Sequence, residues 1–84
     1  MKVTLKLFAS LSDFLPDEAR KRNAMELELA PGTTVAQVIE RQNLPLKQCH
    51  LVLIDGIYVP PAERGARMLA EGETLAIWPP IAGG

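Results

Sequence analysis

The sequence has few of the residues that build catalytic and metal centres. One cysteine and one histidine in 84 residues cannot form an internal disulfide or supply the four ligands of a structural zinc site. There is no Ser/His/Asp set, and the six glycines include no phosphate-cradling loop. We therefore exclude a disulfide scaffold and a zinc module, and we expect no metal site.

Neither sign of charge is in surplus, and long apolar runs are missing. Nine Lys and Arg residues face ten Asp and Glu residues, for a formal net charge of -1. Proteins that bind nucleic acid or anionic membranes need a surplus of basic residues. No apolar run approaches the ~18 residues of a membrane helix, and Lys2 and Lys6 interrupt the start of the chain where a signal peptide would have an apolar core. We expect a cytoplasmic protein with no nucleic-acid or membrane partner.

The carboxylates and the lone thiol give no sign of catalysis. The acidic residues fall mostly on expected strand exteriors, turns and loops, where solvated side chains are the rule. Cys49 and His50 are adjacent, but neighbours in a strand point to opposite faces and cannot act as nucleophile and base. We interpret Cys49 as a packed or partly exposed thiol. If the chain takes part in a reaction, the reacting group is not a side chain.

Alternation of apolar residues predicts two strands in the first third of the chain. In residues 3–7 every second residue is apolar and the residues between are basic or polar. In residues 25–29 the residues between the apolar ones are acidic, so the opposite charges of the two exposed faces suit antiparallel pairing. The connection between them predicts one or two helical turns and a charged, solvated stretch at 17–23. Its apolar side is expected to consist of Leu11, Phe14 and Leu15.

A helix and further strands are expected in the rest of the chain. Thr34 and Gln37 have the spacing of a capping box, which predicts a helix over residues 35–42. An apolar strand at 51–54, a tight turn at Asp55-Gly56 and a short strand at 57–59 are expected next. A surface loop at 60–67 should follow, after which Met68 and Leu69 return to the core and residues 75–78 form the last strand.

This order of elements predicts an α+β fold. We expect a β-grasp (ubiquitin-like) roll, in which a mixed sheet of about five strands carries one main helix on one face and leaves the other face open. Residues 1–78 are expected to form this domain and residues 79–84 an extended tail.

Three of the four aromatic residues are expected on the open face of the sheet. Phe8, Tyr58 and Trp78 alternate with residues assigned to the core. Together they would form an apolar patch beside the root of the tail, of the composition that protein interfaces favour. A slipped register or a bulge would instead put one or two of them inside.

The last six residues favour an extended backbone. Pro79 and Pro80 fix two successive φ angles and favour a stiff exit from the last strand. The small residues that follow can thread a narrow channel and present a carboxylate to a buried active site: Ile81, Ala82, Gly83 and Gly84. An inert chain end with incidental glycines is an equally open interpretation of these residues.

The same residues resemble a known family. The run Ile77-Trp78-Pro79-Pro80-Ile81-Ala82-Gly83-Gly84 is similar to the closing motif of the ubiquitin-like sulfur carriers, specifically the small subunit of molybdopterin synthase, which is MoaD-like and related to the thiamin carrier ThiS. Further similar segments are Leu7-Phe8-Ala9, Pro31-Gly32-Thr33-Thr34-Val35 and Glu71-Gly72-Glu73-Thr74-Leu75. The tail is the specific part, and the other segments are common in small β-grasp domains.

The resemblance implies a reactive carboxylate on Gly84. An E1-like adenylyltransferase would adenylate it with ATP and Mg²⁺, and a sulfur donor of the cysteine desulfurase or rhodanese type would convert it to a thiocarboxylate. The tail would then donate sulfur to cyclic pyranopterin monophosphate in the large subunit of molybdopterin synthase, in a heterotetramer. Phe8 and Trp78, with Tyr58 a weaker candidate, would pack against that subunit. The chain itself would bind no cofactor and would be the sulfur-donating subunit of a sulfurtransferase complex.

Other functions share the same tail. Related carriers serve thiamin, cysteine or tRNA thiolation pathways, and some ubiquitin-like proteins are attached to lysines of other proteins. A plain β-grasp interaction domain with an inert tail is a third possibility. The Pro-Pro-x-Ala-Gly-Gly ending favours the molybdopterin branch. Arg64 and Arg67 of the surface loop are candidate contacts to the activating enzyme.

Overall fold

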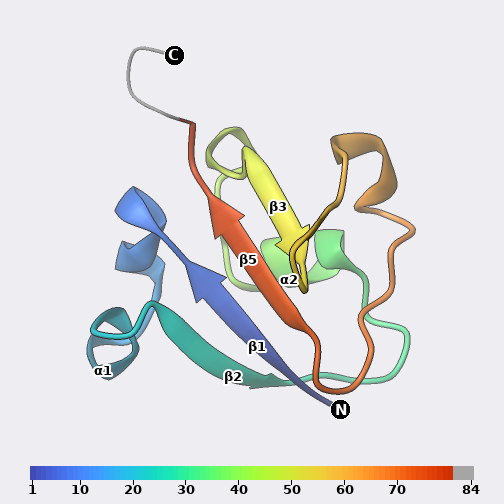
Figure 1. Ribbon diagram of the computed structural model, residues 1–84, viewed down its shortest axis with the longest axis horizontal. Helices are drawn as coiled ribbons and strands as arrows, with labels where there is room; N and C mark the ends of the chain where they lie inside the picture. Colours follow the sequence, from blue (N-terminus) through green and yellow to red (C-terminus); the bar gives the residue numbers. More distant parts are fainter. Residues whose placement is uncertain (81–84) are drawn as a thin grey trace.

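A five-stranded mixed sheet organises the computed structural model, which describes residues 1–80 (Figure 1). Its strand order is β2-β1-β5-β3-β4, and every neighbouring pair is antiparallel except β1 and β5, which are parallel. The strands are β1 (Lys2–Leu7), β2 (Ala24–Glu28), β3 (Leu51–Ile54), β4 (Ile57–Tyr58) and β5 (Thr74–Trp78). This confirms the predicted mixed sheet and the predicted pairing of the first two strands.

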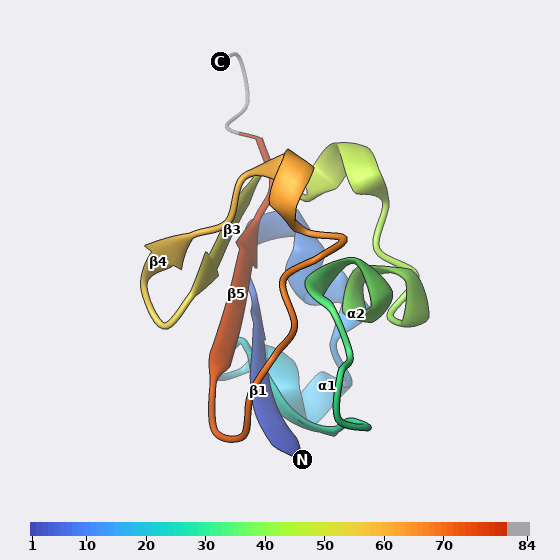
Figure 2. The same ribbon diagram turned by 90° about the vertical axis from the view of Figure 1, so that its right-hand side faces the viewer.

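One face of the sheet is covered by helix α2 (Val35–Arg41), as Figure 2 shows with the sheet nearly edge-on. Val35, Val38 and Ile39 are buried against the sheet. The predicted capping box is present: Thr34 Oγ1 accepts from the Gln37 amide at 3.2 Å, and Gln37 Oε1 accepts from the Thr34 amide at 2.9 Å. The helix ends one residue earlier than predicted.

The capping box gives the first testable prediction. Thr34→Ala removes the oxygen that accepts from the Gln37 amide, so the free energy of unfolding should fall by about 1 kcal/mol. Urea unfolding followed by circular dichroism measures the difference. Thr34→Ser is the matched control, because it keeps an accepting hydroxyl and should retain most of the stability. If both variants lost the same amount, the cap would not be the cause.

The core lies between α2 and the sheet. It is built from alternate residues of the strands together with the buried face of the helix, and among residues 1–80 its members lie between Val3 and Ile77. Five of them are completely inaccessible to solvent: Leu5, Val35, Val52, Leu75 and Ile77. The alternation that predicted β1 is therefore confirmed. In β5 Leu75 and Ile77 are buried as predicted, but Ala76 between them is buried as well.

The connection from β1 to β2 is more helical than expected. It contains the 3-10 helix η1 (Ala9–Phe14) and the single turn α1 (Asp17–Arg20). Leu11 and Leu15 are buried, but Phe14 is 41% exposed, so its predicted place on the apolar side is wrong. The charged stretch predicted as solvated holds α1 because Pro16 precedes it and acidic residues in its first turn suit a helix start.

The loop before β5 places only one of two neighbouring apolar residues in the core. Leu69 is buried and its amide donates to Thr33 O at 2.9 Å, whereas Met68 is 58% exposed. Met68 pairs with Thr34 in an isolated antiparallel bridge. In such an extended segment adjacent side chains point in opposite directions, so the prediction that both return to the core is wrong for Met68.

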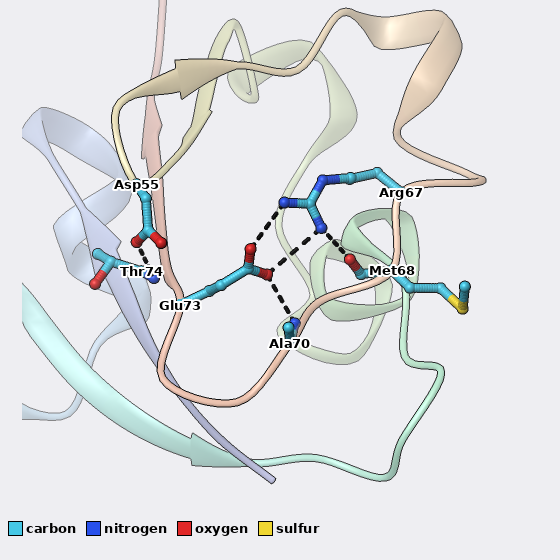
Figure 3. Close-up of polar contacts among 6 residues, drawn as sticks. All are labelled: Asp55, Arg67, Met68, Ala70, Glu73 and Thr74. Atoms are coloured by element: carbon cyan, nitrogen blue, oxygen red, sulfur yellow. Dashed lines mark hydrogen bonds and ion pairs between the residues drawn. The ribbon is translucent and has the colours of Figure 1, made fainter.

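The hairpin between β3 and β4 has the predicted turn. Asp55 and Gly56 both adopt positive φ, 49° and 85°, as a tight two-residue turn requires. Asp55 Oδ1 also accepts from the Thr74 amide at 2.8 Å, which ties the hairpin to the start of β5 (Figure 3).

Candidate functional site

Strands β1 and β5 finish at the same end of the sheet. β1 and β5 are parallel, with Leu7 beside Ile77 in register, so the next residues along are Phe8 and Trp78 (Figure 1). The Phe8 amide donates to Ile77 O at 3.2 Å and continues the ladder. After β1 the backbone turns away from the sheet at Ala9, which has a φ of 52°. After β5 the backbone continues into Pro79.

The side chains of Phe8 and Trp78 stack on each other. Their ring centroids are 4.3 Å apart and their planes are inclined by 6°. Each is partly covered by the other, and both remain accessible on the open face. A pair of stacked rings therefore stands immediately before the two prolines.

The open face continues this apolar surface across the sheet. Leu51 pairs with Trp78, and Leu53 pairs with both Ala76 and Tyr58, so alternation puts all of them on the same face. Leu51 is 37% exposed and Tyr58 is 49% exposed. We call this surface the aromatic face; it consists of Phe8, Leu51, Leu53, Tyr58, Ala76 and Trp78.

The structure thus places Phe8, Tyr58 and Trp78 where the sequence predicted, with Tyr58 on β4 and the other two at the end of the sheet. Their role as partner contacts stays a prediction. Leu51 and Leu53 were missed because they sit in a continuous apolar run, in which the period of two is hidden. Only the pairing of β3 with β5 shows which of its residues face outward.

The tail is only partly described. Pro79 is partly buried and Pro80 is exposed, and neither belongs to a helix or strand. The candidate residues Ile81, Ala82, Gly83 and Gly84 lie outside the described residues, and so does the predicted extension of the tail.

Cys49 and His50 do not form a catalytic pair, but for a different reason than predicted. They lie between the 3-10 helix η2 (Leu46–Gln48) and β3, so they are not strand neighbours. Cys49 is 3% exposed and its Sγ donates to Pro45 O at 3.4 Å. Burial raises the pKa of the Cys49 thiol, against the smaller opposing effect of the Arg64 charge. The thiol is therefore kept in its protonated, unreactive form.

Arg64 is a structural residue in this fold. It follows the 3-10 helix η3 (Pro61–Glu63), and its guanidinium donates to the carbonyl oxygens of Cys49 at 2.8 Å, Val59 at 3.2 Å and His50 at 3.2 Å. These bonds join the loop to the segment that leads into β3. Its proposed contact with an activating enzyme would have to use the donors that these carbonyls leave free.

Arg67 is held in a similar way by the turn before β5 (Figure 3). Its Nη2 lies 2.8 Å from Glu73 Oε2, and its Nη1 donates to the Met68 carbonyl. Glu73 also accepts from the Ala70 amide at 2.7 Å. The bond from Arg67, with that from Ala70, holds the pKa of the Glu73 carboxyl below its ordinary value of 4.5.

The lowered pKa of Glu73 predicts a pH-dependent contribution to stability. Because the folded pKa lies below the unfolded one, the contribution is complete well above pH 4.5 and is lost as the pH falls from there through the lower pKa of the folded state. Glu73→Gln cannot ionise, so the gap in unfolding free energy between the two proteins should be largest at neutral pH and shrink in acid. Urea unfolding at a series of pH values measures it.

Glu26→Gln is the matched control for that series. Glu26 is exposed on β2 and makes no ion pair among residues 1–80. The difference in unfolding free energy between Glu26→Gln and the wild-type protein should therefore stay small at every pH. A Glu73→Gln gap that did not change with pH would contradict the role given to the Arg67 pair.

Neither metal binding nor membrane insertion has support in the described part of the chain. Among residues 1–80, no three His, Cys, Asp or Glu side chains gather closely enough to hold a metal ion. Within the same residues, no helix has the length and apolar character needed to cross a bilayer.

Comparison with known proteins gives a family match and several similar solved structures, including the two that follow. The family model described as Mut7-C ubiquitin matches residues 1–82. The crystal structure of SAMP1 from Haloferax volcanii has a TM-score of 0.69 at 20% identity, covering 100% of both chains. A putative molybdopterin converting factor, subunit 1, from Pyrococcus furiosus has a TM-score of 0.67 at 22% identity, covering 96% of this chain and 99% of that one. The search of curated proteins gave no significant match.

The family match and the two neighbours confirm the predicted fold. At such identities the neighbours show a shared fold and no more, and that fold is the β-grasp roll which the order of elements predicted. The family match covers nearly the whole chain, including the sheet end that carries the stacked rings. The chain belongs to the Mut7-C ubiquitin family.

Proposed function

We propose that the chain is a ubiquitin-like sulfur carrier whose reactive group is the carboxylate of Gly84. One observation carries the proposal: the Phe8–Trp78 stack stands at the sheet end from which the chain leaves toward its Gly-Gly sequence. A partner that binds the aromatic face is then positioned to receive the tail. The family match and the fold support this, and the lone thiol of the chain, Cys49, is buried with a raised pKa.

The chemistry begins with activation of the carboxylate. A carboxylate oxygen of Gly84 attacks the α-phosphorus of ATP in an E1-like adenylyltransferase, forming an acyl-adenylate and releasing pyrophosphate, with Mg²⁺ bound by that enzyme. The persulfide of a sulfur donor then attacks the acyl carbon and AMP leaves. A thiol reduces the resulting acyl disulfide, which releases the thiocarboxylate. Activation is needed because a carboxylate has no good leaving group until it is esterified to AMP.

The acceptor that we propose is cyclic pyranopterin monophosphate, bound by the large subunit of a molybdopterin synthase. The Pro-Pro-x-Ala-Gly-Gly ending supports this branch, as does the neighbour named as a putative molybdopterin converting factor subunit. In the proposed heterotetramer the aromatic face binds the large subunit, and the tail enters its active site. Carriers for thiamin, cysteine or tRNA thiolation are the alternatives within the same chemistry.

A reconstitution experiment tests the choice of acceptor. The thiocarboxylated chain is mixed with a purified molybdopterin synthase large subunit and cyclic pyranopterin monophosphate, and molybdopterin is measured by the fluorescence of its oxidised derivative. We expect product in proportion to the carrier added and none from the carboxylate form. Formation of the complex without product would place the chain in another sulfur pathway.

Protein modification is the second candidate, and the description of the matched family as a ubiquitin favours it. A modifier forms isopeptide bonds with lysines, whereas a carrier forms only a thiocarboxylate. Immunoblots of cell extracts under reducing conditions separate the two roles. A ladder of larger species that persists under reduction and disappears when Gly84 is deleted would establish conjugation.

A further inference from the structure

Helix α2 covers the face of the sheet opposite the open one (Figure 2). A second, partly apolar surface lies beside this helix. Two adjoining hollows of about 440 and 460 Å³ share three lining residues, Ala36 and Ile39 of α2 and Leu46 of η2. The first hollow extends from there to Arg64 after η3. It is therefore formed by three segments that the fold brings together from different parts of the sequence.

The first hollow has an apolar wall and an exposed apolar side chain beside it. Ile39 and Cys49 are buried, at 2% and 3% exposure, and form part of its lining. Leu46 is 78% exposed, more than any other large apolar side chain among the described residues. A partner that covered Leu46 together with the hollow would remove this apolar surface from water, which favours binding.

The charge around the first hollow is of one sign. Lys47, His50 and Arg64 line it, and no acidic residue does; Glu40 lines only the second hollow. The bonds from Arg64 to the carbonyls of Cys49 and His50 fix the place of its charge. Lys47 makes no ion pair among residues 1–80. In a chain with a net charge of -1, this is a local concentration of basic groups that favours an acidic occupant.

The hollow suits a peptide better than a small ligand. Small-ligand sites fix their ligand with a few inward-facing polar groups. Among the described residues, every buried side-chain nitrogen and oxygen already has a hydrogen-bond partner. No unpaired buried polar atom is therefore left in this hollow to fix a small ligand. The available charge of the hollow lies on the exposed side chain of Lys47, which a peptide lying across the surface can reach. The exposed imidazole of His50 lies in the same lining and can take part in a hydrogen bond.

We propose that this hollow binds an acidic peptide segment of a partner protein, with an apolar side chain of the segment against Ile39 and Leu46 and a carboxylate beside Lys47. This interaction is additional to the proposed sulfur transfer and does not use the aromatic face. A partner could therefore hold the chain here while its tail is engaged elsewhere.

The test uses a synthetic peptide as probe. The capped heptapeptide Ser-Glu-Glu-Leu-Glu-Leu-Ser is titrated into the ¹⁵N-labelled full chain, and amide chemical shifts are followed by NMR. We expect saturable shifts centred on Ala36, Ile39, Leu46 and His50, with binding weakened by added salt. Peptides with serine in place of leucine, or lysine in place of glutamate, should bind much more weakly.

Variants of the chain identify the surface. Lys47→Glu should weaken binding about fivefold, because it replaces attraction by repulsion at an exposed pair. Leu46→Ser should weaken it about tenfold through lost apolar contact. Both residues are exposed, so the fold should be retained, which the spectra show directly. Lys21→Glu, the same charge change away from the hollow, is the matched control and should leave affinity unchanged.

Four results would overturn the proposal. The first is an absence of saturable shifts, and the second is shifts centred on the aromatic face. The third is equal weakening by Lys21→Glu, which would mean a non-specific charge effect. The fourth comes from a chain truncated after Pro80: if the free protein already differed at the hollow, residues 81–84 of the same chain would be its occupant.

Discussion

Deleting Gly84, or replacing Gly83 by tyrosine, is expected to abolish sulfur transfer and leave the free energy of unfolding unchanged. Deletion moves the carboxylate back by one residue, and tyrosine adds a ring to a segment that has to pass through a narrow channel. Among residues 1–80 the core extends from Val3 to Ile77, and we expect neither change to touch it. Sulfur transfer should therefore be lost while the free energy of unfolding stays at the wild-type value.

Two measurements establish that separation. Thiocarboxylate formation is measured by intact mass after incubation with the activating enzyme and sulfur donor, and stability is measured by urea unfolding. Gly65→Ala is a suitable control, because a methyl group there meets no atom within 4 Å. Wild-type levels of thiocarboxylate in the tyrosine variant would show that the tail does not enter a narrow channel, and a loss of stability would show that it contributes to the core.

Replacing Trp78 by alanine is expected to weaken partner binding by about 2 kcal/mol, or ~30-fold in Kd. Trp78 stacks on Phe8, pairs with Leu51 across the sheet and directly precedes Pro79, so it lies at the centre of the proposed contact. Large aromatic side chains at such positions dominate interface energies. The variant also loses the stack within the fold, at a cost of about 0.5–1.5 kcal/mol of stability.

Calorimetric titration with the purified large subunit measures the affinity, at a temperature where unfolding data show that both proteins are folded. Phe14→Ala is the matched control: it removes another exposed aromatic ring, but one that lies in η1 instead of on the sheet. Unchanged affinity for Trp78→Ala would remove the aromatic face from the interface. Equal losses in both variants would point to a general effect of removing aromatic rings.

The fold was predictable wherever one face of a segment is buried. In β1 the buried Val3, Leu5 and Leu7 alternate with more exposed residues, so the period of two appears in the sequence itself. The capping box and the Asp55-Gly56 turn were predictable because they depend on local hydrogen bonding and backbone conformation. Order and spacing of these elements were enough to predict the β-grasp roll.

Short irregular segments were not predictable in the same way. The exposure of Phe14 and Met68 depends on where a 3-10 helix ends and on an isolated bridge to Thr34, and a sequence pattern contains neither. Cys49 and His50 were interpreted as neighbours in a strand, but β3 begins only at Leu51. The hollow on the α2 side combines residues from α2, η2 and the loop after η3, so only the folded chain brings them together.

The central claim is that the carboxylate of Gly84 carries sulfur. The most direct test incubates the untagged protein, ending at Gly84, with an E1-like activating enzyme, ATP, Mg²⁺ and a sulfur donor, and then records its intact mass. We predict a gain equal to the replacement of one oxygen by one sulfur, mapped by fragmentation to Gly84 and absent when ATP is omitted. An unchanged mass, with an enzyme and donor that thiocarboxylate another carrier in a parallel reaction, would contradict it.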